Sequence, residues 1–144
     1  MAFSFPMQDR IRISCSRQNL QQVRDFVRGF LLEAKRNDLQ VNQVVLAVDE
    51  VVANFIIHAN NEDASQFLDL LLVLAGPRLD IEIEDHGNTL FLPPGKAPNP
   101  DLRAYIQQGR KGGMGMALVS RIMDQVEFFE RNSHTVCHLS KVLT

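Results

Sequence analysis

The hydrophobic residues of the first sixty positions follow two different periods, and each period predicts a different element. Over residues 10–16 apolar and polar residues alternate, which predicts a half-buried strand. Over residues 19–37 the apolar residues recur every three or four positions, which predicts an amphipathic helix. A second helix is expected over residues 41–59. It should be largely buried because its apolar residues lie on almost every side.

The middle of the chain predicts a hairpin followed by a long connecting segment. Residues 66–75 and 79–84 have the composition and alternation of strands, and the intervening Gly76-Pro77 pair favours a turn. Residues 88–111 then carry four prolines and show no regular period. Compact domains rarely contain a loop of this length unless it is functional or disordered.

The last thirty residues predict one more helix and two closing strands. The helix is expected over residues 114–123 and the strands over 126–130 and 135–142. The whole order is strand, two helices, two strands, loop, helix and two strands. Adjacent strands with helices packed on one side favour an α/β fold of the two-layer sandwich type, rather than a doubly wound sheet.

Length, charge and composition exclude several classes of protein. The chain has 144 residues, which suits a single domain spanning 1–144. A formal net charge of −2 gives no indication of a nucleic-acid or anionic-membrane surface. The longest apolar run, residues 67–75, is too short to cross a bilayer. Because residues 1–9 also lack a signal-peptide pattern, we expect a cytoplasmic protein.

The second expected helix contains a polar stripe in an otherwise apolar sequence. Glu50, Asn54 and His58 follow one another at intervals of four residues, and Asp49 stands beside the first of them. A solvated helix face would normally carry lysine, arginine or several glutamates, and this stripe does not. Buried carboxylates and amides are costly without a bonding partner. The stripe therefore favours a site in which a carboxylate acts as general base beside a hydrated metal ion.

Asp85 and Gly87 form the second candidate feature. Ile81 and Ile83 should face the core, so the period of two also points Asp85 inward at the end of its strand. An inward carboxylate needs a hydrogen-bond donor, and the exocyclic amine of a purine is one candidate. Gly87 would let a flat ligand approach the backbone closely. The same residues also suit a simple turn, and the pattern alone leaves the two interpretations equal.

The third candidate is the glycine-rich segment over residues 112–116, which leads into the expected third helix. Backbone N–H groups at such a helix start can hold phosphate oxygens, and Lys111 beside them suits a phosphate contact. A flexible hinge is the alternative. The segment lacks the Gly-Lys-Ser/Thr ending of a Walker loop. Met114 and Met116 are most simply explained as core packing.

The histidines show no local metal-binding pattern. His86, His134 and His138 have no metal-like spacing with one another or with either cysteine, Cys15 and Cys137. The sequence therefore gives no reason to expect a metal site built from these side chains.

Taken in order, the candidate motifs resemble the GHKL-type ATPases, the group that includes the catalytic domains of histidine kinases and gyrase. The matching features are Glu50-x-x-x-Asn54, Asp85-x-Gly87, a Gly-x-Gly over residues 113–115 and a threonine in a closing strand. Residues 50–59 look like the version found in anti-sigma factor serine kinases. The resemblance covers nearly the whole chain and implies the Bergerat fold, with helices on one face of a mixed sheet.

The resemblance implies a role for each matching residue. Asn54 would ligate Mg²⁺, Glu50 would be the general base of phosphoryl transfer, and Asp85 would accept a hydrogen bond from adenine. Residues 88–111 would form a mobile lid over the phosphates. The remaining residues implied in nucleotide binding are His58, Gly87, Lys111, Gly113, Met114, Gly115, Met116 and Thr135. Phe55 departs from the family pattern, which usually has a small residue after the asparagine.

The implied function is that of an ATP-dependent serine/threonine kinase acting as an anti-sigma factor. Its substrate would be an anti-sigma antagonist protein, and it would bind a sigma factor. The alternative is a catalytically silent, nucleotide-dependent binding module that sequesters a sigma factor or another regulator. Homodimers are common in this branch, and the strand at residues 10–16 is a candidate contact.

Overall fold

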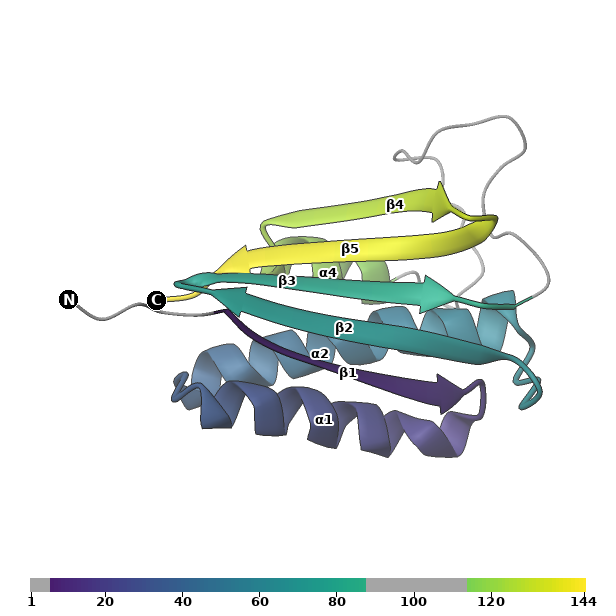
Figure 1. Cartoon of the computed structure of the whole chain (residues 1–144), viewed down its shortest axis with the longest axis horizontal. Helices are drawn as coiled ribbons and strands as arrows, with labels where there is room; N and C mark the ends of the chain where they lie inside the picture. Colours follow the sequence, from purple (N-terminus) through teal and green to yellow (C-terminus); the bar gives the residue numbers. More distant parts are fainter. Residues whose placement is uncertain (1–5, 88–113) are drawn as a thin grey trace.

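The computed structural model describes residues 6–87 and 114–144. These residues form five strands, three α-helices and two short helical turns (Figure 1). In chain order the elements are β1 (Met7–Ser14), η1 (Arg17–Asn19), α1 (Leu20–Glu33), α2 (Asp38–Asn54), η2 (Phe55–Ala59), β2 (Phe67–Ala75), β3 (Arg78–Asp85), α4 (Met114–Ile122), β4 (Gln125–Arg131) and β5 (His134–Val142). The order and type of these elements agree with the pattern of the sequence.

The five strands form one sheet in the order β1-β2-β3-β5-β4. Each of the four neighbouring pairs is antiparallel, so the expectation of a mixed sheet is wrong. The connections between the strands explain why neighbouring strands run antiparallel. Tight turns join β2 to β3 and β4 to β5, while two antiparallel helices return the chain to the end of β1 before β2 begins (Figure 1).

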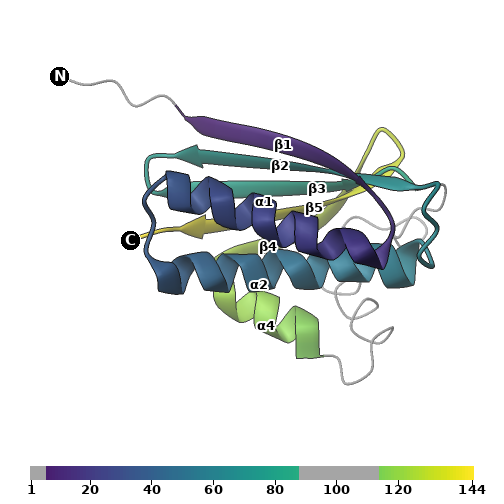
Figure 2. The ribbon, with the colours of Figure 1, turned by 90° about the horizontal axis from the view of Figure 1, so that it is seen from below.

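All three α-helices cover the same face of the sheet, which gives the predicted two layers (Figure 2). Alternate residues of the central strands point into this layer and are buried. On β2 and β3 these inward residues are Leu68, Leu70, Leu72, Leu74, Leu79, Ile81 and Ile83. None of the described helices lies on the other face, where charged side chains alternate with the core residues. The predicted inward direction of Ile81 and Ile83 is confirmed.

Helix α2 lies between α1 and α4 and forms the centre of the helical layer (Figure 2). Its start is capped by Asn37, whose side chain accepts a hydrogen bond from the backbone N–H of Gln40 at 2.9 Å. Together with η2 it forms a run of 22 residues that is long and apolar enough to cross a membrane. More than half of that run is buried in the fold, which is typical of a core helix.

The second helix was expected to continue unchanged to residue 59, but its last turn is π-helical. Over Phe55–Ala59 the hydrogen bonds widen, and the backbone N–H of Asn60 reaches the carbonyl oxygen of Phe55 at 3.0 Å. Phe55 is 1% exposed and packs against Phe128, with 6.4 Å between ring centroids. The unusual phenylalanine after Asn54 is therefore a core residue.

Strand β1 forms one edge of the sheet and starts at Met7, earlier than the expected position 10. It pairs along its whole length with β2, and its other side has no strand partner among the described residues. The candidate dimer contact at residues 10–16 is therefore an edge strand, while dimerisation itself stays a prediction.

Candidate functional site

Asp85 is the last residue of β3, and its carboxylate lies on the face covered by the helices. The residue is only 2% exposed. Its Oδ1 accepts a hydrogen bond from the backbone N–H of Gly87 at 2.8 Å, and Nδ2 of Asn60 lies 3.1 and 3.2 Å from the two oxygens. Burial raises the pKa of Asp85, while these two donors and the nearby His86 and His134 act in the opposite direction.

Asn60 is a site residue that the sequence interpretation missed. It is 8% exposed, and its Nδ2 also donates to the carbonyl oxygen of Phe55 at 2.9 Å. The π-helical turn places it there, because the wider turn ends directly beneath the end of β3. The only signal in the sequence was an asparagine pair, Asn60-Asn61, at the end of an apolar helix, and this pattern ordinarily indicates a helix stop.

The space around residue 87 has no room for a side chain, so glycine is required there. A Cβ atom on Gly87 would overlap with Oδ1 of Asn60 and would lie 3.0 Å from Oδ1 of Asp85. No side chain therefore fits without moving the pair that holds the carboxylate. The group that approaches Gly87 in this structure is Asn60, and the expected approach of a flat ligand stays a prediction.

Thr135 stands opposite Asp85 in the pairing of β3 with β5. Directly opposed residues in an antiparallel pair point to the same face, so Thr135 also points into the helical layer. It is 2% exposed. Thr135 thus lies beside Asp85 on the same face of the sheet, and its implied part in nucleotide binding stays a prediction.

Glu50 and Asn54 lie one turn apart at the end of α2, as their spacing predicts. Asn54 is 2% exposed, and its Nδ2 donates to the carbonyl oxygen of Glu50 at 3.0 Å. This bond fixes the orientation of the amide. Its Oδ1 is buried and has no hydrogen-bond partner among the described residues. Glu50 itself is partly buried.

His58 does not continue the stripe as a regular helix would place it. It belongs to the π-helical turn, in which residues four apart no longer align, and it is partly buried. Asp49, the neighbour of Glu50, forms an ion pair with Arg24 of α1 at 2.7 Å. Asp49 therefore holds two helices together and is not part of the candidate site.

The glycine-rich segment is described only from the first residue of α4 onward. Met116 is fully buried, which confirms its expected place in the core, and Gly115 is also buried. As residues of the first turn of α4, Met114, Gly115 and Met116 offer backbone N–H groups at a helix start. Lys111, Gly113 and the expected lid at residues 88–111 lie outside the described residues.

The raised pKa of Asp85 predicts a pH-dependent contribution to stability. A carboxyl whose pKa is higher in the folded state stabilises the fold at low pH, and this contribution is lost as the pH rises from the ordinary aspartate value through the raised one. Asp85→Asn, which stays neutral, should therefore gain stability relative to the wild type across that window. Urea unfolding at about pH 4 and about pH 7 measures the difference. If the difference in unfolding free energy between Asp85→Asn and the wild type were the same at both pH values, this prediction would be wrong.

Comparison with known families decides the assignment of the fold. The family model for the histidine kinase-like ATPase domain matches residues 13–141, which is nearly the whole chain. This chain belongs to the histidine kinase-like ATPase domain family. Membership indicates an ATP-binding domain.

Two similar proteins are named as anti-sigma F factors. The anti-sigma F factors of Bacillus cereus (strain G9842) and Anoxybacillus flavithermus (strain DSM 21510 / WK1) are each 25% identical over 136 residues. Each alignment covers 93% of this chain and 91% of the relative.

A solved structure has the same fold. It is the crystal structure of the RsbU and RsbW domains of Rv1364c from Mycobacterium tuberculosis, which superposes with a TM-score of 0.66 over 97% of this chain at 17% identity. The chain spans about a third (32%) of that protein, and the likeness supports the fold alone.

Proposed function

We propose that this chain works in the cytoplasm as an anti-sigma factor with serine/threonine kinase activity, using Mg-ATP to phosphorylate an anti-sigma antagonist protein. The proposal extends the names of the relatives, anti-sigma F factors at 25% identity, to this chain. It also includes binding of a sigma factor and assembly as a homodimer. Family membership supports an ATP-binding fold, and the arrangement of Glu50, Asn54 and Asp85 supports phosphate transfer.

The observation that carries the proposal is the meeting of the candidate groups at one end of the molecule. The ends of α2 and β3 and the start of α4 lie together there (Figures 1 and 2). Asn60, which follows α2 and its π-helical turn η2, is hydrogen-bonded to Asp85 at the end of β3. Glu50 and Asn54 from α2 and Asp85 from β3 thus line the same end.

Asn54 fits the role of a magnesium ligand. Its Oδ1 is a carboxamide oxygen, a donor type that Mg²⁺ accepts, and it is buried without a hydrogen-bond partner among the described residues. Its Nδ2 is already bound to the Glu50 carbonyl, which leaves Oδ1 for an ion. The ion, when bound, would neutralise phosphate charge during the transfer.

The chain's own residues would divide the work of the reaction. Asp85, held by Asn60 and Gly87, would accept a hydrogen bond from the adenine amine and so fix the base. Glu50 would take the proton from the attacking serine or threonine hydroxyl. The hydroxyl oxygen would then form its bond to the γ-phosphorus as the bond to the leaving ADP oxygen breaks.

Loss of the Asp85 carboxylate should weaken nucleotide binding. A hydrogen bond to a buried charged group is worth roughly 1.5–3 kcal/mol, so Asp85→Ala should bind Mg-ATP at least about tenfold more weakly in calorimetry. Asp80→Ala is the matched control, because Asp80 lies on the same strand but on the opposite face, where it contacts Arg78 and His138. The control should bind as the wild type does. Equal affinities for wild type and Asp85→Ala would overturn the site.

A further inference from the structure

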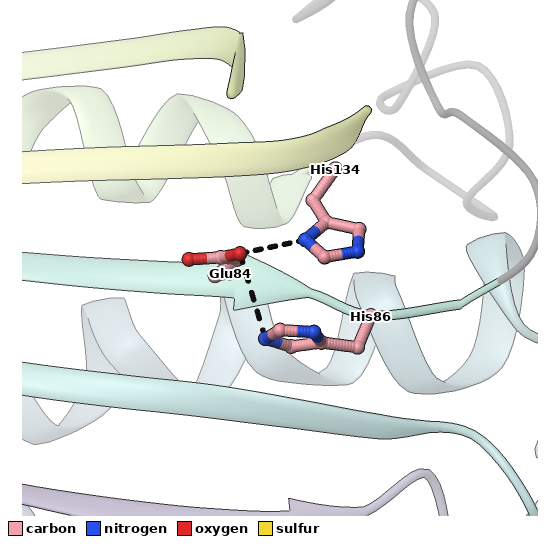
Figure 3. A group of neighbouring side chains, drawn as sticks. All are labelled: Glu84, His86 and His134. Atoms are coloured by element: carbon pink, nitrogen blue, oxygen red, sulfur yellow. Dashed lines mark hydrogen bonds and ion pairs between the residues drawn. The ribbon is translucent and has the colours of Figure 1, made fainter. Parts of the chain in front are cut away.

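We propose that Glu84, His86 and His134 form a binding site for one divalent transition-metal ion of the zinc class. One ligand atom from each of the three side chains lies within 4.8 Å of the other two (Figure 3). The three side chains gather on the face of the sheet that no described helix covers. This site goes beyond the proposed kinase function and does not depend on it.

The fold brings these residues together although the sequence separates them by up to fifty positions. Glu84 and His86 alternate with Asp85 at the end of β3, so they lie on the opposite face from the adenine site. His134 begins β5 directly after a two-residue turn in which both Asn132 and Ser133 have positive φ. Such a turn gives a tight hairpin and brings His134 back beside β3.

The distances are close to those that a bound ion requires. Nδ1 of His134 lies 2.7 Å from Oε2 of Glu84, and Nε2 of His86 lies 3.5 Å from the same oxygen. Tetrahedral ligands about 2.0–2.2 Å from zinc are about 3.3 Å apart, so small side-chain movements would admit the ion. Asp69 offers a fourth donor, since its Oδ2 lies 2.8 Å from Nε2 of His86.

His86 turns a buried nitrogen toward two carboxylates. Its Nε2 lies 2.8 Å from Oδ2 of Asp69 and 3.5 Å from Oε2 of Glu84. Imidazole nitrogen together with carboxylate oxygen is a ligand set that zinc and neighbouring metals bind well.

Neighbouring side chains orient two of the three ligands, His86 and Glu84. The ring of His86 stacks on Phe67, with 4.9 Å between centroids and 21° between planes. Arg131 donates to Oε1 of Glu84 at 2.9 Å, which orients the carboxylate and leaves Oε2 facing the histidines. Supporting contacts of this kind orient ligands in known metal sites. The guanidinium also offsets part of the negative charge, so we expect moderate affinity rather than a very tight site.

Zinc titration of the untagged full chain tests the proposal. Calorimetry at pH 7.5 with Zn²⁺ alone should show one ion per wild-type chain, and His134→Ala should bind at least about tenfold more weakly. His138→Ala is the matched control, because His138 lies on the same strand and is bonded instead to Asp80 at 2.8 Å. It should bind zinc as the wild type does.

A second readout and a second variant keep the test decisive. Zinc should raise the melting temperature of the wild type and of His138→Ala but not that of His134→Ala, whereas Mg²⁺ should raise none of them. Glu84→Gln keeps the shape of the side chain and should also weaken zinc binding, so the test survives if His134→Ala does not fold. No zinc binding by the wild type, or equal binding by both ligand variants, would overturn the proposal.

Discussion

Glu50→Gln should abolish most phosphate transfer while leaving nucleotide affinity nearly unchanged. The substitution keeps the size of the side chain but removes its basicity, so loss of a general base should slow transfer by about 10²- to 10⁴-fold. Nucleotide binding should change little, because Asp85 and Asn54 hold the adenine and the magnesium ion in the proposed arrangement. Transfer is measured with radiolabelled ATP, and affinity is measured by calorimetry.

The adjacent acidic residue supplies the control for this experiment. Asp49→Asn removes a carboxylate from the same helix, but one that pairs with Arg24 of α1 at 2.7 Å. It should keep its phosphate transfer and lose at most about 1 kcal/mol of stability, since the pair is partly exposed. If Glu50→Gln transferred phosphate as fast as the wild type, the base would have to be another group.

Gly87→Ala should disrupt the proposed adenine site through a single added methyl group. The new Cβ would overlap with Oδ1 of Asn60, so Asn60 would have to move away from Asp85. The carboxylate would then lose its orientation, and Mg-ATP affinity should fall at least about tenfold, as for loss of a charged hydrogen bond. Calorimetry measures the affinity, and a thermal melt shows whether the fold survives.

Gly29→Ala provides the matched control, because its Cβ would meet no atom within 4 Å. Gly29 lies in α1, where alanine is the better helix former, so this variant should gain about 0.5–1 kcal/mol of stability. Its nucleotide affinity should equal that of the wild type. An equally unaffected affinity in Gly87→Ala would show that the close contact with Asn60 does not shape the site.

The sequence could predict the side of the sheet on which Asp85 lies because strand geometry is strictly alternating. Once Ile81 and Ile83 are assigned to the core, the period of two leaves only one direction for Asp85, and the structure confirms it. The spacing of Glu50 and Asn54 worked in the same way, since both precede the change of helix type. Within a regular strand or helix, the direction of a side chain can be predicted from its spacing to residues already assigned to the core.

The features that could not be predicted depend on irregular backbone or on distant pairing. The π-helical turn that places Asn60 under Asp85 has no clear sequence signal. His86 and His134 have no metal-like spacing, yet strand pairing brings their ring centroids to 4.2 Å. The antiparallel direction of β1 and β2 depends on the path of the two helices between them, and the hydrophobic pattern of the strands does not determine it.

Serine/threonine kinase activity is tested most directly by incubating the wild-type chain with Mg-ATP and an anti-sigma antagonist protein, while binding of the two proteins is measured in parallel. The γ-phosphate should appear on a serine or threonine of the partner, and Glu50→Gln should bind the same partner without labelling it. Full binding of the partner by the wild type with no transfer of phosphate would contradict the proposed kinase activity. The site would then be a nucleotide-dependent clamp.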